Sequence, residues 1–147
     1  MKIVKCGRAD ISRLAKLNKQ LIDDEGSSNT MGIDQLEKRM AGFLAGNYDA
    51  YFFVEDYEVV GYALVDKSAE PLYLRHFMIE RGFRRKHLGT EAFNLLMDYL
   101  RCDKLDVEVL SGNAAGVGFW ESLGFREVSR YLRLNRRGVK TNNGNGH

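Results

Sequence analysis

The spacing of apolar residues changes near residue 47, and this change constrains the possible fold more than any other feature of the sequence. The earlier apolar residues recur at helical spacing in two stretches, one after Asp10 and one from Ile33 to a stop near Gly46. The next segments, YDAYFFVED and EVVGYALVDK, have strand composition and flank a tight turn at 55–58, which predicts a hairpin. Two helices followed by a hairpin are typical of the α/β class.

The rest of the chain continues the alternation of strands and helices. Further strands are expected at 2–7, 72–80, 104–110 and 127–136, and further helices at 87–102 and 113–125. The order β-α-α-β-β-β-α-β-α-β predicts one α/β domain over 1–136, with a mixed sheet of about six strands and about four helices. The remaining tail at 137–147 is rich in asparagine and glycine, so we expect it to be disordered.

Composition argues against several classes of protein. A net charge of +2 over 147 residues is small for a dedicated nucleic-acid binder. The start of the chain has no apolar signal segment, and the longest apolar run, AYFFV at 50–54, is too short to span a membrane. Cys6 and Cys102 stand apart with no metal-ligand spacing, so we expect reduced thiols, no metal and a cytoplasmic location.

A basic, glycine-containing segment, RRKHLGT at 84–90, lies between the expected strand at 72–80 and the helix that follows it. A helix N-terminus presents free main-chain N–H groups and partial positive charge, and both favour a phosphate. Gly89 would let the main chain approach that phosphate closely. Nearby cations would add charge neutralisation, namely Arg81, Arg84, Arg85 and Lys86. The same cluster also fits a solvated basic helix start.

The segment FRRKHLGTEAF resembles the acyl-CoA-binding motif of the GNAT superfamily of N-acyltransferases, which reads Arg/Gln-x-x-Gly-x-Gly/Ala. Arg84 fills the first position, His87 replaces the first glycine, and Gly89 keeps the second. NAAGVGFWESLGF at 113–125 is similar to a second segment of that family, Asn-x-x-Ala-x-x-Phe-Tyr-x-x-x-Gly-Phe. The matching residues are Asn113, Phe119, Gly124 and Phe125, with Gly116 in place of alanine and Trp120 in place of tyrosine.

The resemblance covers nearly the whole domain and implies a GNAT-like fold with splayed central parallel strands, 72–80 and 104–110. The pantetheine arm of acetyl-CoA would pair with main-chain groups of the first strand, and the pyrophosphate would rest on the amides of 85–90. A strand amide would stabilise the oxyanion while an amine attacks the thioester directly. The cofactor-binding residues implied are Phe77, Met78, Ile79, Arg84, Arg85, Lys86, His87, Leu88, Gly89, Thr90, Asn113 and Trp120.

Two residues depart from the family pattern. His87 brings a side chain where the main chain should approach phosphate, which a right-handed helical conformation would tolerate. Trp120 occupies the place of the tyrosine that protonates the leaving thiolate, and an indole lacks useful acidity. Water or Tyr131 would have to replace that acid, while Trp120 is either a wall of the thioester pocket or a core aromatic.

The acceptor side is defined by a few residues. By strand alternation, Tyr73 and Arg75 should share a face with Phe77, and they occupy the motif positions where some members carry a base. Neither is a good base at pH 7. His76 has a suitable pKa but should face the other side unless a bulge intervenes, which favours a buried structural histidine. A water chain is the remaining base.

An acidic segment between the first two helices could attract a cationic amine or simply be a solvated loop. Its residues Asp24 and Glu25 are substrate-site candidates together with Tyr73 and Arg75. We expect a carboxylate of the 23–25 segment to pair with Arg75, because a guanidinium in a cleft is costly to desolvate alone. An unpaired Arg75 that is open to the cleft would instead favour an acceptor with an anionic group beside its amine. A side chain that leaves β-strand 72–80 on the opposite face would contradict both expectations.

These features predict an N-acyltransferase that moves acetyl from acetyl-CoA to a small amine or a protein amino group, as a monomer or a homodimer. The alternative is a non-catalytic acyl-CoA-binding or sensing module, because no base or acid is evident. Nucleic-acid binding through the basic cluster ranks below both, since one patch supplies few phosphate contacts. We expect no membrane partner.

Overall fold

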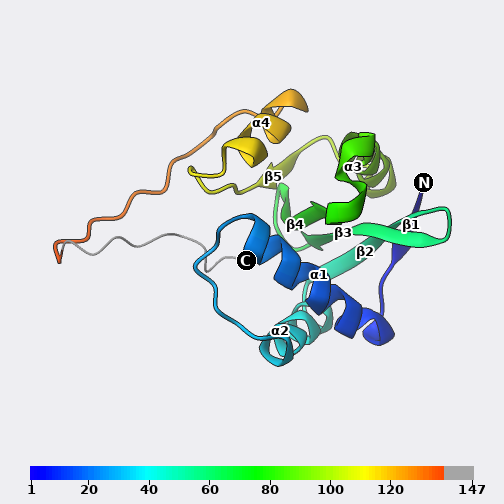
Figure 1. Ribbon diagram of the computed structural model, residues 1–147. Coiled ribbons are helices and arrows are strands. Elements are labelled where there is room, and N and C mark those ends of the chain that lie inside the picture. Colours follow the sequence, from blue (N-terminus) through cyan, green and yellow to red (C-terminus); the bar gives the residue numbers. More distant parts are fainter. Residues whose placement is uncertain (138–147) are drawn as a thin grey trace.

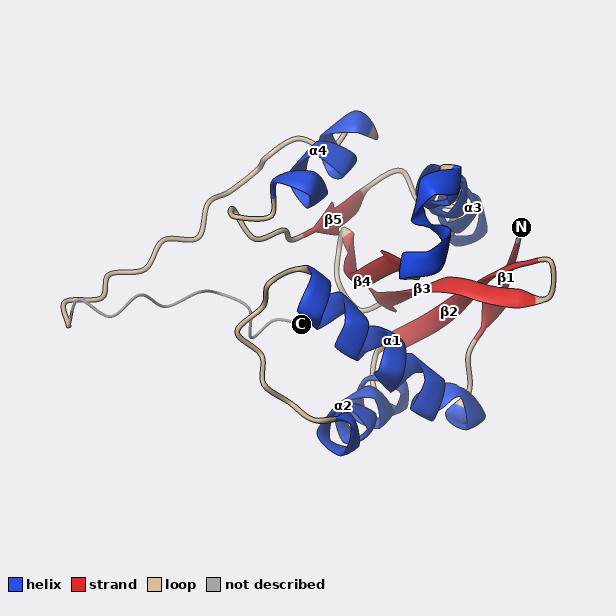
Figure 2. Ribbon diagram, viewed as in Figure 1, coloured by secondary structure: helices blue, strands red, loops and turns tan. Residues whose placement is uncertain are grey.

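A five-stranded mixed sheet forms the centre of the computed structural model, which describes residues 1–137 (Figure 2). The strand order is β1-β2-β3-β4-β5, antiparallel from β1 to β4, with β5 parallel to β4. The strands are β1 (Lys2–Lys5), β2 (Tyr48–Glu55), β3 (Glu58–Asp66), β4 (Leu72–Ile79) and β5 (Leu105–Val107).

Helices cover both faces of this sheet (Figure 1). They are α1 (Ile11–Asp24), α2 (Ile33–Ala45), α3 (Leu88–Leu100) and α4 (Ala114–Ser122), with 3-10 turns η1 (Arg8–Asp10) and η2 (Arg81–Lys86). On one face, Leu14 of α1 and Met40 of α2 share a buried cluster with Tyr62. On the other, Phe93 of α3 shares a buried cluster with Phe53, and Trp120 of α4 packs against it. The predicted α/β class is confirmed.

A β-bulge interrupts β4 at Arg75. The register with β3 moves from Leu64 opposite His76 to Val65 opposite Leu74, so Arg75 has no opposing residue. An extra residue in one strand breaks the alternation of side chains between the two faces.

Because of the bulge, the side chains of β4 lie on different faces of the sheet from those expected. Arg75 packs against Phe43 of α2, and the ring of His76 also contacts Phe43, so both side chains lie on the α1–α2 side. Phe77 lies on the opposite side against Phe93. The expectation that Arg75 shares a face with Phe77, away from His76, was therefore wrong, and so were both acceptor roles expected for Arg75 on the Phe77 face.

The two parallel strands part soon after they meet. β5 pairs with β4 only from Leu72 to Leu74, opposite Leu105 to Val107. Within residues 1–137, the edge of β4 from Arg75 to Ile79 has no strand beside it on the β5 side. Main-chain groups on that edge are therefore available to an extended ligand, as the splayed strands of the family predict.

The strand expected at 127–136 does not form. Figure 1 shows this segment leaving the body of the molecule beyond α4, and it contains no strand residues. Val128 and Leu132 are 88% and 86% exposed. A segment with strand composition forms a strand only where it pairs with another strand, and within residues 1–137 the segment 127–136 does not pair with β5. The sheet therefore has five strands, and positions 138–147 of the expected tail lie outside the described residues.

Candidate functional site

The junction between β4 and α3 reverses its backbone handedness at His87. The 3-10 turn η2 ends at Lys86, and His87 then adopts φ 57° and ψ 23°, in the left-handed region, before α3 begins at Leu88. The right-handed conformation expected for His87 was wrong. A side chain with a Cβ is disfavoured in the left-handed region whereas glycine is not, which explains physically why the motif carries glycine at this position.

The first turn of α3 has main-chain amides without helical partners and lies close to α4. His87, the residue before the helix, makes no capping hydrogen bond with its side chain. The amides of Leu88, Gly89 and Thr90 precede the helical hydrogen-bond ladder, so they lack intrahelical acceptors. A Cβ on Gly89 would lie 3.3 Å from Cε1 of Phe119, so a larger residue here would fit only if the Phe119 ring shifted by a few tenths of an ångström.

The basic residues before α3 bind the end of α1. The guanidinium groups of Arg81 and Arg84 donate to the two carboxylate oxygens of Asp24. Arg84 Nε also donates to the main-chain oxygen of Ile79 at 2.7 Å. Partial burial alone would raise the pKa of the Asp24 carboxyl, but the bonds from Arg81 and Arg84 outweigh burial and hold this pKa below its usual value.

These contacts change the expected role of the basic cluster. Arg84 and Arg81 already neutralise a carboxylate, and Ile79 already uses its main-chain oxygen. The main chain of Arg85 and Lys86 belongs to η2, but their side chains lie outside the described part of the structure.

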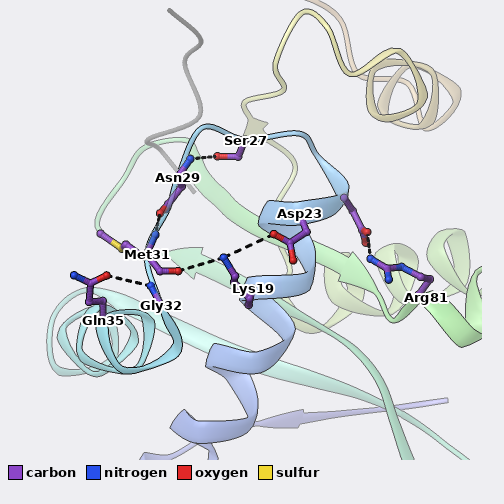
Figure 3. A network of polar contacts seen from close by, with 9 residues as sticks. Lys19, Asp23, Ser27, Asn29, Met31, Gly32, Gln35 and Arg81 are labelled. Carbon is purple, nitrogen blue, oxygen red and sulfur yellow. Dashed lines mark hydrogen bonds and ion pairs between the residues drawn. The ribbon is translucent and has the colours of Figure 1, made fainter.

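The connection from α1 to α2 is held by short-range bonds rather than left as a loose loop (Figure 3). The Asn29 amide donates to Ser27 Oγ at 3.1 Å, and the Met31 amide donates to Asn29 Oδ1 at 2.9 Å. Lys19 on α1 reaches the Met31 oxygen at 3.4 Å, which ties the connection back to the helix. The segment that follows Asp24 and Glu25 thus has a defined course beside α1.

A cluster of five aromatic rings fills the space between β4, α3 and α4. Trp120 lies 5.5 Å from Phe77, 5.9 Å from Phe93 and 5.1 Å from Phe125, measured between ring centroids. The ring of Phe119 stacks on Phe77 at 5.9 Å. This position gives Trp120 a packing role, next to the strand expected to hold the pantetheine arm.

Asn113 begins α4 as its N-cap residue. Its Oδ1 accepts a hydrogen bond from the Gly116 amide at 3.0 Å. A Cβ on Gly116 would come within 2.5 Å of Asn113 Nδ2, so this cap requires glycine where the family motif has alanine. The structure therefore accounts for Asn113 through helix capping.

On the α1–α2 side of the sheet, Arg75 faces aromatic rings instead of a carboxylate. Its Cζ lies 5.0 Å from the centroid of the Phe43 ring, and its Nη1 donates to Tyr48 Oη at 3.3 Å. The expected pair between Arg75 and the 23–25 segment was wrong. Asp24 meets arginines that follow the end of β4, whereas Arg75 lies in the middle of that strand.

Arg39 of α2 belongs to the same group and was missed by the sequence analysis. Its Cζ lies 5.6 Å from the Phe43 centroid, and its Nη2 donates to Asn18 Oδ1 at 2.9 Å. Burial, and then the charge of Arg75, lower the pKa of Arg39. The signal was present in the sequence, because Arg39 precedes Phe43 by one helical turn and therefore shares its face.

The proposed proton carriers occupy very different positions. His76 is 1% exposed, and its Nδ1 lies 3.0 Å from Tyr62 Oη, as a structural histidine would. Tyr131 is 69% exposed in the segment beyond α4, where its hydroxyl accepts from Arg133 at 3.0 Å. Tyr73 lies near Arg75, and burial is the main cause that raises its pKa, followed by the charge of Glu108.

The family model of the GNAT acetyltransferases matches residues 17–125, and the chain therefore belongs to this acetyltransferase family. A search of curated proteins finds no match. Within residues 1–137, no helix is long and apolar enough to cross a membrane, and no three His, Cys, Asp or Glu side chains form a metal-binding group.

Several solved acetyltransferase structures share the fold. A possible acetyltransferase from Clostridium difficile 630 has a TM-score of 0.75 and 17% identity, covering 92% of this chain and 96% of that chain. A predicted acetyltransferase with acetyl-CoA from Clostridium acetobutylicum has a TM-score of 0.70 and 17% identity, covering 95% and 99%. An aminoglycoside 6'-N-acetyltransferase from Acinetobacter haemolyticus, in apo form, has a TM-score of 0.70 and 13% identity, covering 92% and 98%. At sequence identities of 13% to 17%, these structures show a shared fold and nothing further about this chain.

Proposed function

We propose that this protein transfers an acetyl group from acetyl-CoA to a primary amine by direct attack in a ternary complex. One observation carries the proposal. Within residues 1–137, the edge of β4 that faces β5 lies unpaired after Leu74, next to an α3 N-terminus whose first turn contains Gly89. A thioester needs an extended groove for its arm and an anion site for its pyrophosphate, and these two features supply them side by side.

The main chain would do most of the cofactor binding. The pantetheine arm would pair with β4 between Phe77 and Ile79, and the pyrophosphate would accept from the amides of Leu88, Gly89 and Thr90. A β4 amide near the bulge would donate to the thioester oxygen and stabilise the oxyanion as the amine attacks. The match to a relative solved with acetyl-CoA supports this arrangement.

No side chain is needed as an essential base. An ammonium must lose a proton before attack, and the departing thiolate must gain one. His76 is buried against Tyr62 and Tyr131 is exposed beyond α4, so we assign both proton transfers to water. An activity that survives substitution of either residue would agree with this assignment.

The amine would belong to a small molecule or to a protein, and the aminoglycoside acetyltransferase among the relatives supports the small-molecule version. The second candidate function is a non-catalytic acyl-CoA-binding module, favoured by the position of Trp120 among core rings instead of a tyrosine acid.

Release of free thiol from acetyl-CoA in the presence of an amine panel tests the proposal. Calorimetric titration with acetyl-CoA and CoA provides the binding measurement. We expect binding together with amine-dependent thiol release. Binding without release on any amine would favour the sensing module, and a lack of binding at millimolar CoA would contradict both functions.

A further inference from the structure

Two partly buried arginines meet over one phenylalanine ring on the α1–α2 side of the sheet. The Cζ atoms of Arg39 and Arg75 lie 5.6 and 5.0 Å from the centroid of Phe43. Their charges are close enough to interact, because Arg75 helps to lower the pKa of Arg39 after burial, the larger cause. α2 and the bulge in β4 thus bring two like charges together.

Within residues 1–137, neither Arg39 nor Arg75 forms an ion pair. Their hydrogen-bond acceptors are neutral, Asn18 Oδ1 at 2.9 Å and Tyr48 Oη at 3.3 Å. The Nε atoms of both arginines are buried without an acceptor.

This arrangement is costly in the free protein. Two guanidinium groups repel each other, and each buried N–H without an acceptor loses the hydrogen bond it made to water. A bound anion would remove both costs, since the planar guanidinium fork matches the two oxygens of a carboxylate or a phosphate. The pair therefore has the chemistry of an anion site.

The position of Arg75 indicates which molecule would bring the anion. Arg75 directly follows the last pair between β4 and β5, Leu74 with Val107, so it stands where the two strands part. The phosphates of CoA belong at α3, beyond the other end of β4. An anion on Arg75 would instead lie beside the proposed thioester position, within a few bonds of an attacking amine.

The surrounding charges indicate the kind of anion. Glu25 and Glu108 lie close enough to Tyr73 to contribute to its raised pKa, after the larger effect of burial. Asp66 also lies within electrostatic range of Arg75. With these carboxylates in the neighbourhood, the two arginines suit a single negative charge with an ammonium beside it better than a dianionic phosphate.

We infer that Arg39 and Arg75 bind a carboxylate of the acceptor, so that the substrate class is α-amino acids or molecules that carry an amine and a carboxylate equally close together. This inference rests on the proposed acetyl transfer, and it adds the substrate class that the family assignment leaves open. The rings of Phe43 and Tyr48, against which the guanidinium groups pack, would also contact the carbon skeleton of the acceptor.

The test compares matched acceptors at saturating acetyl-CoA, with thiol release as the readout. The panel contains L-amino acids, the corresponding primary amides, and aminoalkyl phosphates. We expect kcat/KM for the acids to exceed that for the amides by about 10- to 100-fold, the range of a charge-assisted bond. Arg75→Gln and Arg39→Gln should remove this preference, because KM should rise much more for the acids than for the amides.

Two control variants separate charge from geometry. Arg75→Lys keeps the positive charge without the planar fork and should retain only part of the preference. Arg126→Gln removes an exposed arginine beyond α4 and should leave every rate unchanged.

A titration that needs no turnover completes the test. Sodium benzoate is added to the protein while the arginine Nε–H signals are followed by NMR. We expect saturable shifts at Arg39 and Arg75, and none at Arg126. Shifts with inorganic phosphate but not with benzoate, or no saturable shift at all, would overturn the inference.

The two levels of the proposal fail in different ways. Equal rates for acids and amides would overturn the carboxylate site while acetyl transfer stands. If acetyl-CoA neither binds nor reacts, the proposed function fails, and the benzoate titration still decides whether the arginines bind a carboxylate.

Discussion

Arg84 donates through its guanidinium to the carboxylate of Asp24, which lies 60 residues earlier in the chain. Its Nε simultaneously donates to the Ile79 oxygen at 2.7 Å. One side chain thus joins the end of α1 to the end of β4, at the point where the cofactor motif begins. The first residue of that motif is therefore a structural connection between α1 and β4.

Replacing Asp24 with asparagine should lower stability at neutral pH. The pKa of this carboxyl is depressed below the ordinary 3.8 in the folded protein, so its stabilising effect is fully present above 3.8 and is lost as pH falls through the lower, folded pKa. We expect Asp24→Asn to cost about 1 kcal/mol at pH 7, a modest value because both arginines are largely exposed to solvent.

Urea denaturation at pH 7, 5 and 3 measures this effect. The difference between Asp24→Asn and the wild type should persist from pH 7 to 5 and narrow at pH 3. Asp23→Asn is the matched control, since Asp23 makes only a 3.8 Å pair with Lys19 and is 59% exposed. Equal losses for the two variants would mean that the arginine contacts contribute nothing.

Replacing His87 with glycine should stabilise the protein and tighten CoA binding. His87 has a left-handed backbone, which disfavours any residue with a Cβ, so glycine removes backbone strain in the folded protein. This gain is partly offset because glycine has more conformational freedom in the unfolded chain. We expect a gain of about 0.5–1 kcal/mol in urea unfolding. CoA affinity should rise, because the imidazole no longer stands beside the first turn of α3.

Arg101 provides the control for this comparison, since it is also left-handed, with φ 52°, and lies at the opposite end of α3. Arg101→Gly should give a similar gain in stability without any change in CoA affinity. If His87→Gly weakens CoA binding, the imidazole itself donates to the phosphate.

The sequence predicted the elements of this fold well, because each depends on local periodicity. The helical spacing before residue 46, the hairpin turn at 55–58 and the basic segment before α3 all depend on neighbouring residues. The order of the elements then restricts the topology to very few arrangements. The strand-to-helix junction proposed for the cofactor was predictable for the same reason, since it lies within one short stretch of the chain.

The acceptor half was not predictable, because it depends on a bulge and on pairing between distant elements. One extra residue at Arg75 reversed the expected facing of Phe77 relative to Arg75. Asp24 bound Arg84 instead of Arg75, because the end of α1 lies at the end of β4. The segment 127–136 had strand composition, but composition does not specify a partner edge.

Replacing Gly89 with glutamate should abolish CoA binding. The carboxylate would stand at the N-terminus of α3 and repel the pyrophosphate. The first added atom would also lie 3.3 Å from the Phe119 ring, so part of the effect is steric. Gly89→Ala isolates that part: calorimetry should show measurable CoA binding for the alanine variant and none for glutamate. Wild-type affinity in Gly89→Glu would place the phosphate site elsewhere.

Replacing Trp120 with tyrosine tests whether the position of the family's acid is simply vacant. Trp120 packs edge-to-face on Phe77, the strand residue proposed to lie along the pantetheine arm, so a hydroxyl introduced here would stand near the departing sulfur. We expect Trp120→Tyr to keep or raise kcat and to introduce a new basic limb in the pH–rate profile. Trp120→Phe removes the same packing volume without a hydroxyl, so it should lose stability to a similar degree and show no new limb. Tyr131→Phe should leave the profile unchanged, because Tyr131 is 69% exposed beyond α4. Equal losses of activity in the two Trp120 variants would mean that the indole itself shapes the thioester pocket. If Tyr131→Phe alone flattens the basic limb of the pH–rate profile, the segment beyond α4 folds back over the site during turnover.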